Sequence, residues 1–311
     1  MSSVLDRPLR TAILAAADSA LVRRAVTRYG MQWGARRFVA GESEEEFLPV
    51  VRAVNGRGFA VAASLLGESV RDPGEARDVT DRYCRLLRTF AEQRLDANVA
   101  FKLTHVGLDI DPALAYENAA RIAETARQTG NTVRLDMEQS RYVDATLDIY
   151  RRLRQGCDAV GFVLQSYLYR SCDDLAALLA LEPNVRIVKG AYLEPPATAY
   201  PKKRDVDDNY LRLVDLAFSN GGYAAIATHD SRIVERVEHA ARTRGFPAQG
   251  RFEFQLLYGI AEPLARALVA RGYRVRLAVP FGAYWFPYLM RRLAERPANL
   301  AFFVRGALAR R

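Results

Sequence analysis

Eight short apolar runs, rich in β-branched, aliphatic and aromatic residues, recur along the chain, and stretches of helical periodicity lie between most of them. One such stretch, PALAYENAARIAETARQTG, closes with a glycine, as helices commonly do. Repeated alternation of strand and helix predicts an α/β fold of the (β/α)8 TIM-barrel type. The runs span residues 59–66, 98–107, 132–138, 159–166, 185–192, 223–230, 251–257 and 275–280.

A doubly wound open sheet is the alternative to a barrel, but no GxGxxG fingerprint follows the first run, which weakens a Rossmann interpretation. The region before the first run has helical patterning and contains the acidic segment GESEEEF. We therefore expect residues 1–55 to form a helical extension packed outside the barrel, and residues 56–311 to form the barrel itself. No linker, repeat or low-complexity segment divides the chain further.

The composition is that of a globular protein. Half of the residues are hydrophobic, yet no segment reaches the ~18 uninterrupted apolar residues that a membrane-spanning helix needs. The segment TAILAAADSALVRRAV is interrupted by Asp18 and lacks the pattern of a cleavable signal, so we expect an ordinary N-terminal helix there. The residues Cys84, Cys157 and Cys172 form no CxxC pair, which suits a reducing, cytoplasmic compartment.

The chain is basic, with 45 lysines and arginines against 36 acidic residues and a formal net charge of +9. This balance favours anionic partners such as phosphate groups or membrane headgroups. The basic residues are scattered in pairs among acids, and no aromatic-rich RNA motif or helix-turn-helix is present. We therefore expect no nucleic-acid partner.

Polar residues stand at the ends of the predicted strands. In a (β/α)8 barrel the loops that follow the strands converge at one face, and that face carries the chemistry. Because side chains alternate along a strand, Arg134, Asp136 and Glu138 are expected on one face of the third strand. The polar residues in or just after the runs are Lys102, Thr104, His105, Asp136, Glu138, Gln165, Arg186, Lys189, Thr228, His229, Asp230, Glu253 and Gln255.

Lysine is rare in this chain, which has four lysines and 41 arginines. Two of the four, Lys102 and Lys189, fall in predicted strands, although strand ends make up only roughly 7% of a chain of this kind. A compact ammonium group cannot be replaced by a planar guanidinium where space is limited, so these two positions are candidates for function. The alternative is a structural lysine sealed in a buried ion pair with Asp136 or Glu138.

Four kinds of site can be considered at such a barrel mouth. A zinc site is not expected, because only His105 and His229 lie near strand ends. A desolvated lysine suits a Schiff-base aldolase or lyase, and a non-enzymatic anion-binding barrel is a third interpretation. A pocket for several negative groups, namely a carboxylate and a phosphate-bearing cofactor, is favoured by the cations Lys102, Arg186, Lys189, Arg291 and Arg292.

The segment FPYLMRRLAERPANLAFF, residues 286–303, predicts a helix from near Pro287 to before Pro297. Its apolar face would carry Leu289, Met290 and Leu293. The simplest interpretation is an amphipathic surface helix with a solvated cationic face. The opposite, polar face would carry Tyr288, Arg291, Arg292 and Glu295.

Seven motifs occur in the same order as in the proline dehydrogenases: KLTHVGLDI, VRLDME, GFVLQSYLYR, VRIVKGAY, ATHD, FEFQLLYG and PYLMRRLAERPAN. From about residue 60 to about residue 300, the chain thus resembles this family of FAD enzymes, which oxidise proline to pyrroline-5-carboxylate. The resemblance implies a distorted (β/α)8 barrel with FAD over the strand ends. It also implies that the last helix crosses the barrel mouth with its polar face inward.

The resemblance implies roles for particular residues. Arg291 and Arg292 would hold the substrate carboxylate, Lys102 would reach it from below, and Glu295 would orient the arginines. Asp136 and Arg186 match catalytic positions, with Arg186 near the flavin N5, where hydride from C5 of the substrate would arrive. Tyr288, Leu257 and Ala278 match further substrate positions. The matches to flavin contacts are Met137, Gln165, Lys189, Gly190, Ala191, Thr228 and His229.

The resemblance also implies an electron acceptor. The reduced flavin of such an enzyme passes its electrons to a membrane quinone. A basic protein suits peripheral contact with an anionic membrane surface. We therefore expect a cytoplasmic protein that visits the inner membrane.

The eighth run departs from the family pattern. Where the family reads approximately Arg-x-Tyr-x-Pro-Tyr-Gly, this chain reads RLAVPFG, so Ala278 replaces the first tyrosine and Phe281 the second. Loss of the first ring predicts room for a 4-hydroxylated or larger ring, and hence a 4-hydroxyproline dehydrogenase as the alternative. If neighbouring residues refill the space, proline remains the substrate.

Overall fold

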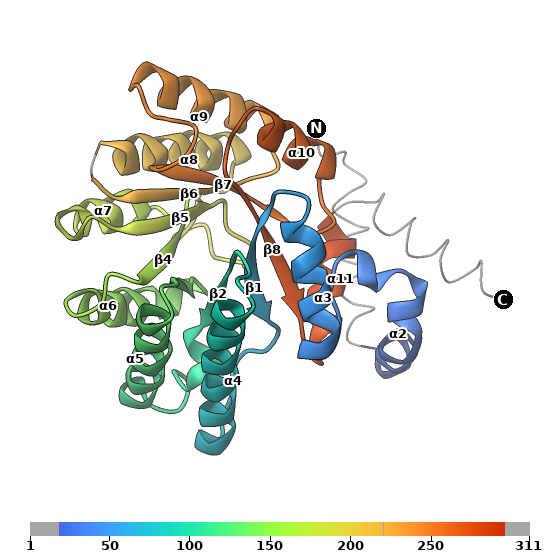
Figure 1. Ribbon diagram of the computed structural model, residues 1–311. Coiled ribbons are helices and arrows are strands. Elements are labelled where there is room, and N and C mark those ends of the chain that lie inside the picture. Colours follow the sequence, from blue (N-terminus) through green and yellow to red (C-terminus); the bar gives the residue numbers. More distant parts are fainter. Residues whose placement is uncertain (1–18, 220, 296–311) are drawn as a thin grey trace.

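Eight parallel strands close into a barrel in the computed structural model, which describes residues 19–219 and 221–295 (Figure 1). Each strand pairs with the next along the chain, and β8 pairs with β1 to close the ring. The predicted (β/α)8 barrel is therefore confirmed. The strands are β1 (Ala60–Leu65), β2 (Ala97–Lys102), β3 (Val133–Asp136), β4 (Val160–Gln165), β5 (Asn184–Val188), β6 (Tyr223–Ala227), β7 (Phe252–Leu257) and β8 (Val275–Phe281).

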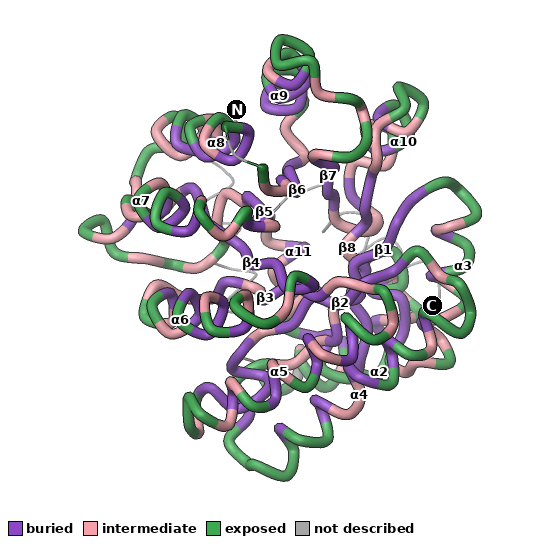
Figure 2. The backbone as a smooth tube through the Cα atoms, turned by 60° about the vertical axis from the view of Figure 1, so that its left-hand side comes forward, coloured by how far each residue is buried: buried purple, intermediate pink, exposed green. Residues whose placement is uncertain are grey.

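Helices follow the strands and surround the barrel. Two of them begin where the sequence marks a start: the side chains of Asp72 and Asp111 accept hydrogen bonds from the amides of Glu75 and Ala113, and a proline follows each aspartate. Figure 2 shows these helices buried on one side and exposed on the other. They are α4 (Pro73–Glu92), α5 (Pro112–Gln128), α6 (Val143–Arg154), α7 (Ser171–Ala176), α8 (Lys203–Phe218), α9 (Ser231–Thr243) and α10 (Glu262–Ala270).

Two strands, β2 and β5, end four or more residues earlier than the apolar runs that predicted them. β2 stops at Lys102, and the chain then forms a short 3-10 helix, η2 (Leu103–Val106), that closes on Gly107 at φ +112°. β5 stops at Val188, and Gly190 follows with φ +113°. Both glycines adopt left-handed backbone angles that a strand does not contain. Lys102 and Lys189 are therefore at strand ends, where loops begin.

The main apolar core lies between the barrel and its helices. It is built from outward-facing strand residues such as Phe101, Leu135 and Phe162, which pack against helix residues such as Tyr150. The inside of the barrel is left to a different set of side chains. This division places the polar strand residues away from the main core.

The N-terminal region up to Asn55 contains α2 (Ala20–Trp33), the 3-10 helix η1 (Ala35–Arg37) and α3 (Glu44–Asn55). The acidic segment starts α3, because Ser43 caps the helix by accepting from the amide of Glu46. The earlier part of the predicted N-terminal helix lies outside the described residues. The division at residue 55 stays a prediction. Among the described helices, none is long and apolar enough to cross a bilayer.

The last described helix, α11 (Trp285–Glu295), starts two residues before the predicted position. Its predicted apolar face is confirmed, since Leu289, Met290 and Leu293 are buried in a second apolar cluster with residues of α2 and η1. The interpretation as a simple surface helix is wrong, because Arg292 on the polar face is only 9% exposed. Figure 2 looks along the barrel and shows α11 across the ring of strands.

Candidate active site

The interior of the barrel holds three buried arginines, Arg134, Arg186 and Arg276. Most barrels of this type fill that space with branched apolar side chains. Here small residues make room, because the register partners of the arginines include Ala60, Ala100, Gly161 and Ala225. A Cβ atom on Gly161 would lie 3.0 Å from Nη1 of Arg134, so that guanidinium needs the glycine.

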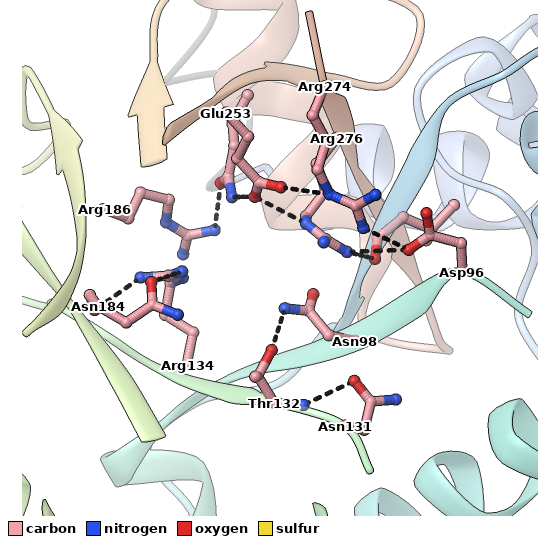
Figure 3. A network of polar contacts seen from close by, with 12 residues as sticks. Asp96, Asn98, Asn131, Thr132, Arg134, Asn184, Arg186, Glu253, Arg274 and Arg276 are labelled. Carbon is pink, nitrogen blue, oxygen red and sulfur yellow. Dashed lines mark hydrogen bonds and ion pairs between the residues drawn. The ribbon is translucent and has the colours of Figure 1, made fainter. Parts of the chain in front are cut away.

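Glu253 is the buried carboxylate at the centre of this interior network (Figure 3). It accepts hydrogen bonds from Nε of Arg276 at 2.8 Å, from Nε of Arg274 at 3.2 Å and from Nε2 of Gln255 at 2.6 Å. Burial by itself raises the pKa of Glu253, but Arg276 and the hydrogen bonds outweigh it and leave the pKa below its usual value. Glu253 is therefore ionised at neutral pH.

Asp136 and Arg186 form an ion pair nearer the mouth of the barrel. Arg186 also donates through Nη1 to Oε1 of Gln255 at 3.3 Å. Burial, and next the charge of Arg134, lower the pKa of Arg186 to about 9, so the guanidinium stays charged at neutral pH. The two residues that match catalytic positions are thus in direct contact across the end of the barrel.

A cleft of about 460 Å³ opens at the ends of β1 to β3 and reaches α11. Its lining includes Lys102 from β2, Asp136 from β3 and both Tyr288 and Arg291 from α11. Lys102 and Asp136 are register partners at the ends of neighbouring strands. The fold therefore brings four of the predicted site residues to one cleft.

Glu68, in the loop after β1, is a residue of this cleft that the sequence prediction missed. It forms an ion pair with Lys102, and its Oε1 lies 3.9 Å from Nη1 of Arg291. Burial tends to raise the pKa of Glu68, but Lys102 and then Arg291 lower it, so its carboxylate is ionised. One carboxylate thus already contacts two of the three cations predicted to bind the substrate carboxylate, Lys102 and Arg291. The strand-end rule, applied to the first run, would have found Glu68.

The loop that carries Glu68 is tied to the neighbouring strands by hydrogen bonds. The amide of Ser69 donates to Oγ1 of Thr104 at 3.2 Å, and Oγ1 of Thr104 in turn donates to Oε2 of Glu138 at 2.7 Å. The carbonyl oxygen of Glu138 accepts from Nε2 of Gln165 at 2.8 Å. Gln165, a predicted flavin contact, is therefore held in place at the end of β4.

His105 packs beneath the same loop and is 4% exposed. Its Nδ1 lies 3.1 Å from the hydroxyl of Tyr83. A Cβ atom on Gly67 would come 2.2 Å from its Nε2, so the loop needs a glycine there. Burial, followed by the charges of Lys102 and Arg82, lowers the pKa of His105 to about 4. The ring is neutral at physiological pH.

Buried His105 predicts an acid-sensitive fold. Its pKa of about 4 in the folded protein lies below the ordinary value of 6.5, so the unfolded chain binds the proton more tightly. Stability should be fully present above about pH 6.5 and fall by on the order of 3 kcal/mol as the pH drops to about 4. His105→Gln should flatten this part of the stability profile in urea unfolding, whereas His239→Gln, on an exposed part of α9, should not. An unchanged slope in His105→Gln would contradict this account.

Several predicted substrate residues do not line this cleft. Arg292 is buried with its guanidinium carbon 5.2 Å from the centre of the Tyr288 ring. Leu257 lines a second cleft of about 440 Å³ with Arg37 and Tyr258. Ala278 is half-buried on β8, in register with Leu257. The side chain of Glu295 lies outside the described part of the structure.

Phe281 does not belong to the site. It is fully buried and stacks on Phe47 of α3, with ring centres 4.0 Å apart. Its side chain therefore packs on the outer side of β8. Of the two departures from the family pattern, Phe281 thus lies on the side of β8 that faces the helices.

The residues that match flavin contacts lie at the ends of β3 to β6. Nζ of Lys189 lies 2.6 Å from Oδ1 of Asp207 and 3.3 Å from Oδ2 of Asp230. Oγ1 of Thr228 accepts from the amide of Asp230, and Nε2 of His229 accepts from the amide of Leu257 at 2.9 Å. This set of side chains is therefore held by hydrogen bonds and ion pairs.

Three of the positions that match flavin contacts, Met137, Gly190 and Ala191, offer little side-chain surface to the barrel mouth. Met137 is buried in the layer between barrel and helices, so only its backbone can face the mouth. Gly190 has φ +113°, and the ring of Tyr167 fills the space beside it, because an added Cβ would lie 2.3 Å from that ring. Ala191 is exposed. In residues 19–219 and 221–295, no three histidine, cysteine or carboxylate side chains gather where they could hold a metal ion.

Comparison with known proteins agrees with this geometry. The family model described as Proline dehydrogenase matches residues 47–305. The chain is 42% identical to Proline dehydrogenase of Deinococcus radiodurans over 310 residues, which cover 98% of this chain and 99% of the relative. It is 39% identical to Proline dehydrogenase 1 of Bacillus subtilis subsp. natto over 300 residues, covering 96% and 99% of the two chains.

A solved structure shows the same fold. Proline utilization A of Bdellovibrio bacteriovorus, inactivated by N-propargylglycine, superimposes with a TM-score of 0.80 at 25% identity. The match covers 86% of this chain but only 33% of that larger protein. Family, full-length relatives and barrel geometry agree, and they decide against a lysine-dependent aldolase: the chain belongs to the proline dehydrogenase family and is an oxidoreductase of that kind.

Proposed function

We propose that the cleft at the ends of β1 to β3 binds proline and that FAD binds over the neighbouring strand ends. The observation that carries the proposal is the position of Glu68, whose carboxylate contacts Lys102 from the barrel and approaches Arg291 from α11. A substrate carboxylate offers the same charge and shape to these two cations. Asp136 lines the same cleft, and its partner Arg186 extends from the adjoining interior.

The residues present fit a flavin. Nε of Arg186 and the hydroxyl of Tyr167 are buried without a hydrogen-bond partner among the described residues, and each can donate to an acceptor. Flavin rings carry carbonyl and imine acceptors of this kind. Once bound, FAD would supply the acceptor for the hydride that leaves C5 of proline. Gln165, Lys189, Thr228 and His229 would contribute to its binding.

The chain's own residues position the substrate. Lys102 and Arg291 would fix the carboxylate from two sides, which restricts the ring to one orientation. Arg292 would support Arg291 through the packed ring of Tyr288, which its guanidinium covers. Arg186, held by Asp136, would place a fixed positive charge where negative charge gathers on the reduced cofactor.

A membrane quinone is the proposed acceptor of the electrons, with peripheral contact at a membrane surface. The net charge of +9 supports attraction to anionic lipids. Helix α2 adds support, because it contains Arg23, Arg24 and Arg28 and no acidic residue. A vesicle-flotation assay with and without anionic lipid tests this contact.

An anaerobic spectral titration tests the proposed function. The purified protein should show a flavin absorbance band that bleaches as L-proline is added. A colourless protein that takes up no added FAD would overturn the proposal. If only 4-hydroxyproline bleaches the band, the substrate is 4-hydroxyproline and not proline.

Ala278 supports 4-hydroxyproline as the second candidate substrate, because a methyl group stands where the family carries a tyrosine ring. Ala278→Tyr should then lower kcat/KM for 4-hydroxyproline relative to proline by roughly 10- to 100-fold. The tyrosine ring would fill the space that the 4-hydroxyl group needs and would clash with that group. Steady-state kinetics with both substrates give the ratio. Phe281→Tyr is the matched control, since that ring faces α3. A ratio that Ala278→Tyr leaves unchanged, with proline strongly preferred, would contradict the second candidate.

A further inference from the structure

The guanidinium group of Arg134 is buried in the barrel and bound only by neutral acceptors (Figure 3). Its Nη1 donates to the carbonyl oxygens of Phe162 and Asn184, each at 3.1 Å. Its Nη2 donates to Oδ1 of Asn184 at 2.6 Å. These contacts satisfy its hydrogen bonds but do not neutralise its charge.

The other two interior arginines are each matched by a carboxylate. Arg276 pairs with Glu253 at 2.8 Å, and Arg186 pairs with Asp136. Over residues 19–219 and 221–295, Arg134 forms no ion pair with a carboxylate. Burial lowers the pKa of Arg134 to about 10, which still leaves it protonated at neutral pH. The interior therefore holds one positive charge in excess.

The backbone of Arg134 lies below the cleft, and its guanidinium reaches toward β4 and β5, where its charge acts on Arg186. Arg134 and Asp136 are on the same face of β3, two residues apart, which is about 6.6 Å along a strand. The register partner of Arg134 on β2 is Ala100, and Ala100 itself lines the cleft. Because protein rather than water fills the space around Arg134, salt cannot screen its charge as it screens a surface charge.

We propose that the uncompensated positive charge of Arg134 stabilises negative charge on the flavin at the barrel mouth. The inference rests on the proposed FAD site and deepens it. Consider a unit positive charge about 10 Å from the flavin, at an effective dielectric constant of about 20. It changes the equilibrium constant of a reaction that adds one negative charge to the flavin on the order of tenfold. Reduction of the flavin to its anionic form is such an equilibrium.

Sulfite binding to the holoenzyme measures this effect without turnover. Sulfite adds to the flavin N5 through its own electron pair, and the adduct leaves extra negative charge on the ring, which absorbance reports. Arg134→Gln removes the charge, whereas Arg134→Lys keeps it. Asn184→Asp leaves Arg134 in place and sets a carboxylate against it, so it neutralises the charge at constant size.

We expect sulfite to bind about tenfold more weakly to Arg134→Gln and Asn184→Asp than to the unmodified enzyme, at low salt and at 0.5 M salt alike, with about 0.5 M chosen to screen surface charges. The two-electron midpoint potential should fall by about 30 mV in the same variants. Arg134→Lys should stay close to the unmodified enzyme. So should Gln155→Glu, which adds the same charge at an exposed position after α6.

An unchanged sulfite affinity and potential in Asn184→Asp would overturn the inference, whether or not Arg134→Gln folds. If Arg134→Lys weakens sulfite binding as much as Arg134→Gln does, the inference is also overturned, because the side chain would then act through its packing and not through its charge. If the unmodified protein binds no flavin, the proposed function fails and this inference with it. If the flavin binds and is bleached by proline, but its sulfite affinity and potential are the same in all variants, only this inference is overturned and the proposed function stands.

Discussion

Asp136→Asn is expected to destabilise the protein by about 3–5 kcal/mol, because it leaves the buried charge of Arg186 without its partner. The side chain of Arg186 is only 10% exposed, so water can solvate its guanidinium only in part once the carboxylate of Asp136 is lost. Among the described residues, this guanidinium also donates to the amide oxygen of Gln255, at 3.3 Å. Urea unfolding monitored by circular dichroism gives the free energy of unfolding.

A matched substitution separates this effect from the loss of any aspartate. Asp144 forms an ion pair with Arg170 at 2.6 Å, but its side chain is 82% exposed. Asp144→Asn should cost at most about 1 kcal/mol, since exposed ion pairs contribute little. Equal effects of the two substitutions would refute the description of Asp136 and Arg186 as a buried pair. Because Asp136 also lines the cleft, flavin reduction by proline should slow as well.

Lys102→Met is expected to lower kcat/KM for proline on the order of 100-fold. The substitution removes one of two cations proposed for the carboxylate, and a charge-assisted hydrogen bond contributes about 1.5–3 kcal/mol. Lys102→Arg should also lose at least about tenfold, because a planar guanidinium cannot take the place of a compact ammonium at the end of β2. Steady-state kinetics under saturating acceptor give both values.

Lys202→Met is the control for the lysine substitutions, because Lys202 is exposed at the start of α8. It should leave kcat/KM within about twofold, as remote surface changes do. An unaltered kcat/KM in Lys102→Met would remove Lys102 from the substrate site. Trapping of substrate on Lys102 by borohydride would instead assign it the Schiff-base role of an aldolase.

The sequence by itself determined the architecture. Each of the eight apolar runs becomes a strand of the closed barrel, because short-range apolar patterning and the capping residues Asp72 and Asp111 act within a few neighbours. The apolar face of α11 was equally legible from helical spacing, and it packs as Leu289 and Met290 indicate. The seven ordered motifs indicated the family, because each motif is a short continuous segment that can be recognised in the sequence without the fold.

Only the tertiary structure decided which polar residues meet. The pairing of Glu68 with Lys102 and Arg291 could not be predicted from the sequence, because these partners lie 34 and 223 positions away and no periodicity links such distant positions. The contact of Phe281 with α3 depends on which side of β8 faces the helices.

The three interior arginines are the clearest case. Arg134 and Arg276 stand in runs that look like ordinary strands, and their burial is possible only because Gly161 and the alanines of neighbouring strands leave space beside them. Which of them is neutralised depends on the reach of Glu253 and Asp136 across the ring. Charge balance inside a barrel is a sum over all of its strands, so it exists only once the barrel is closed.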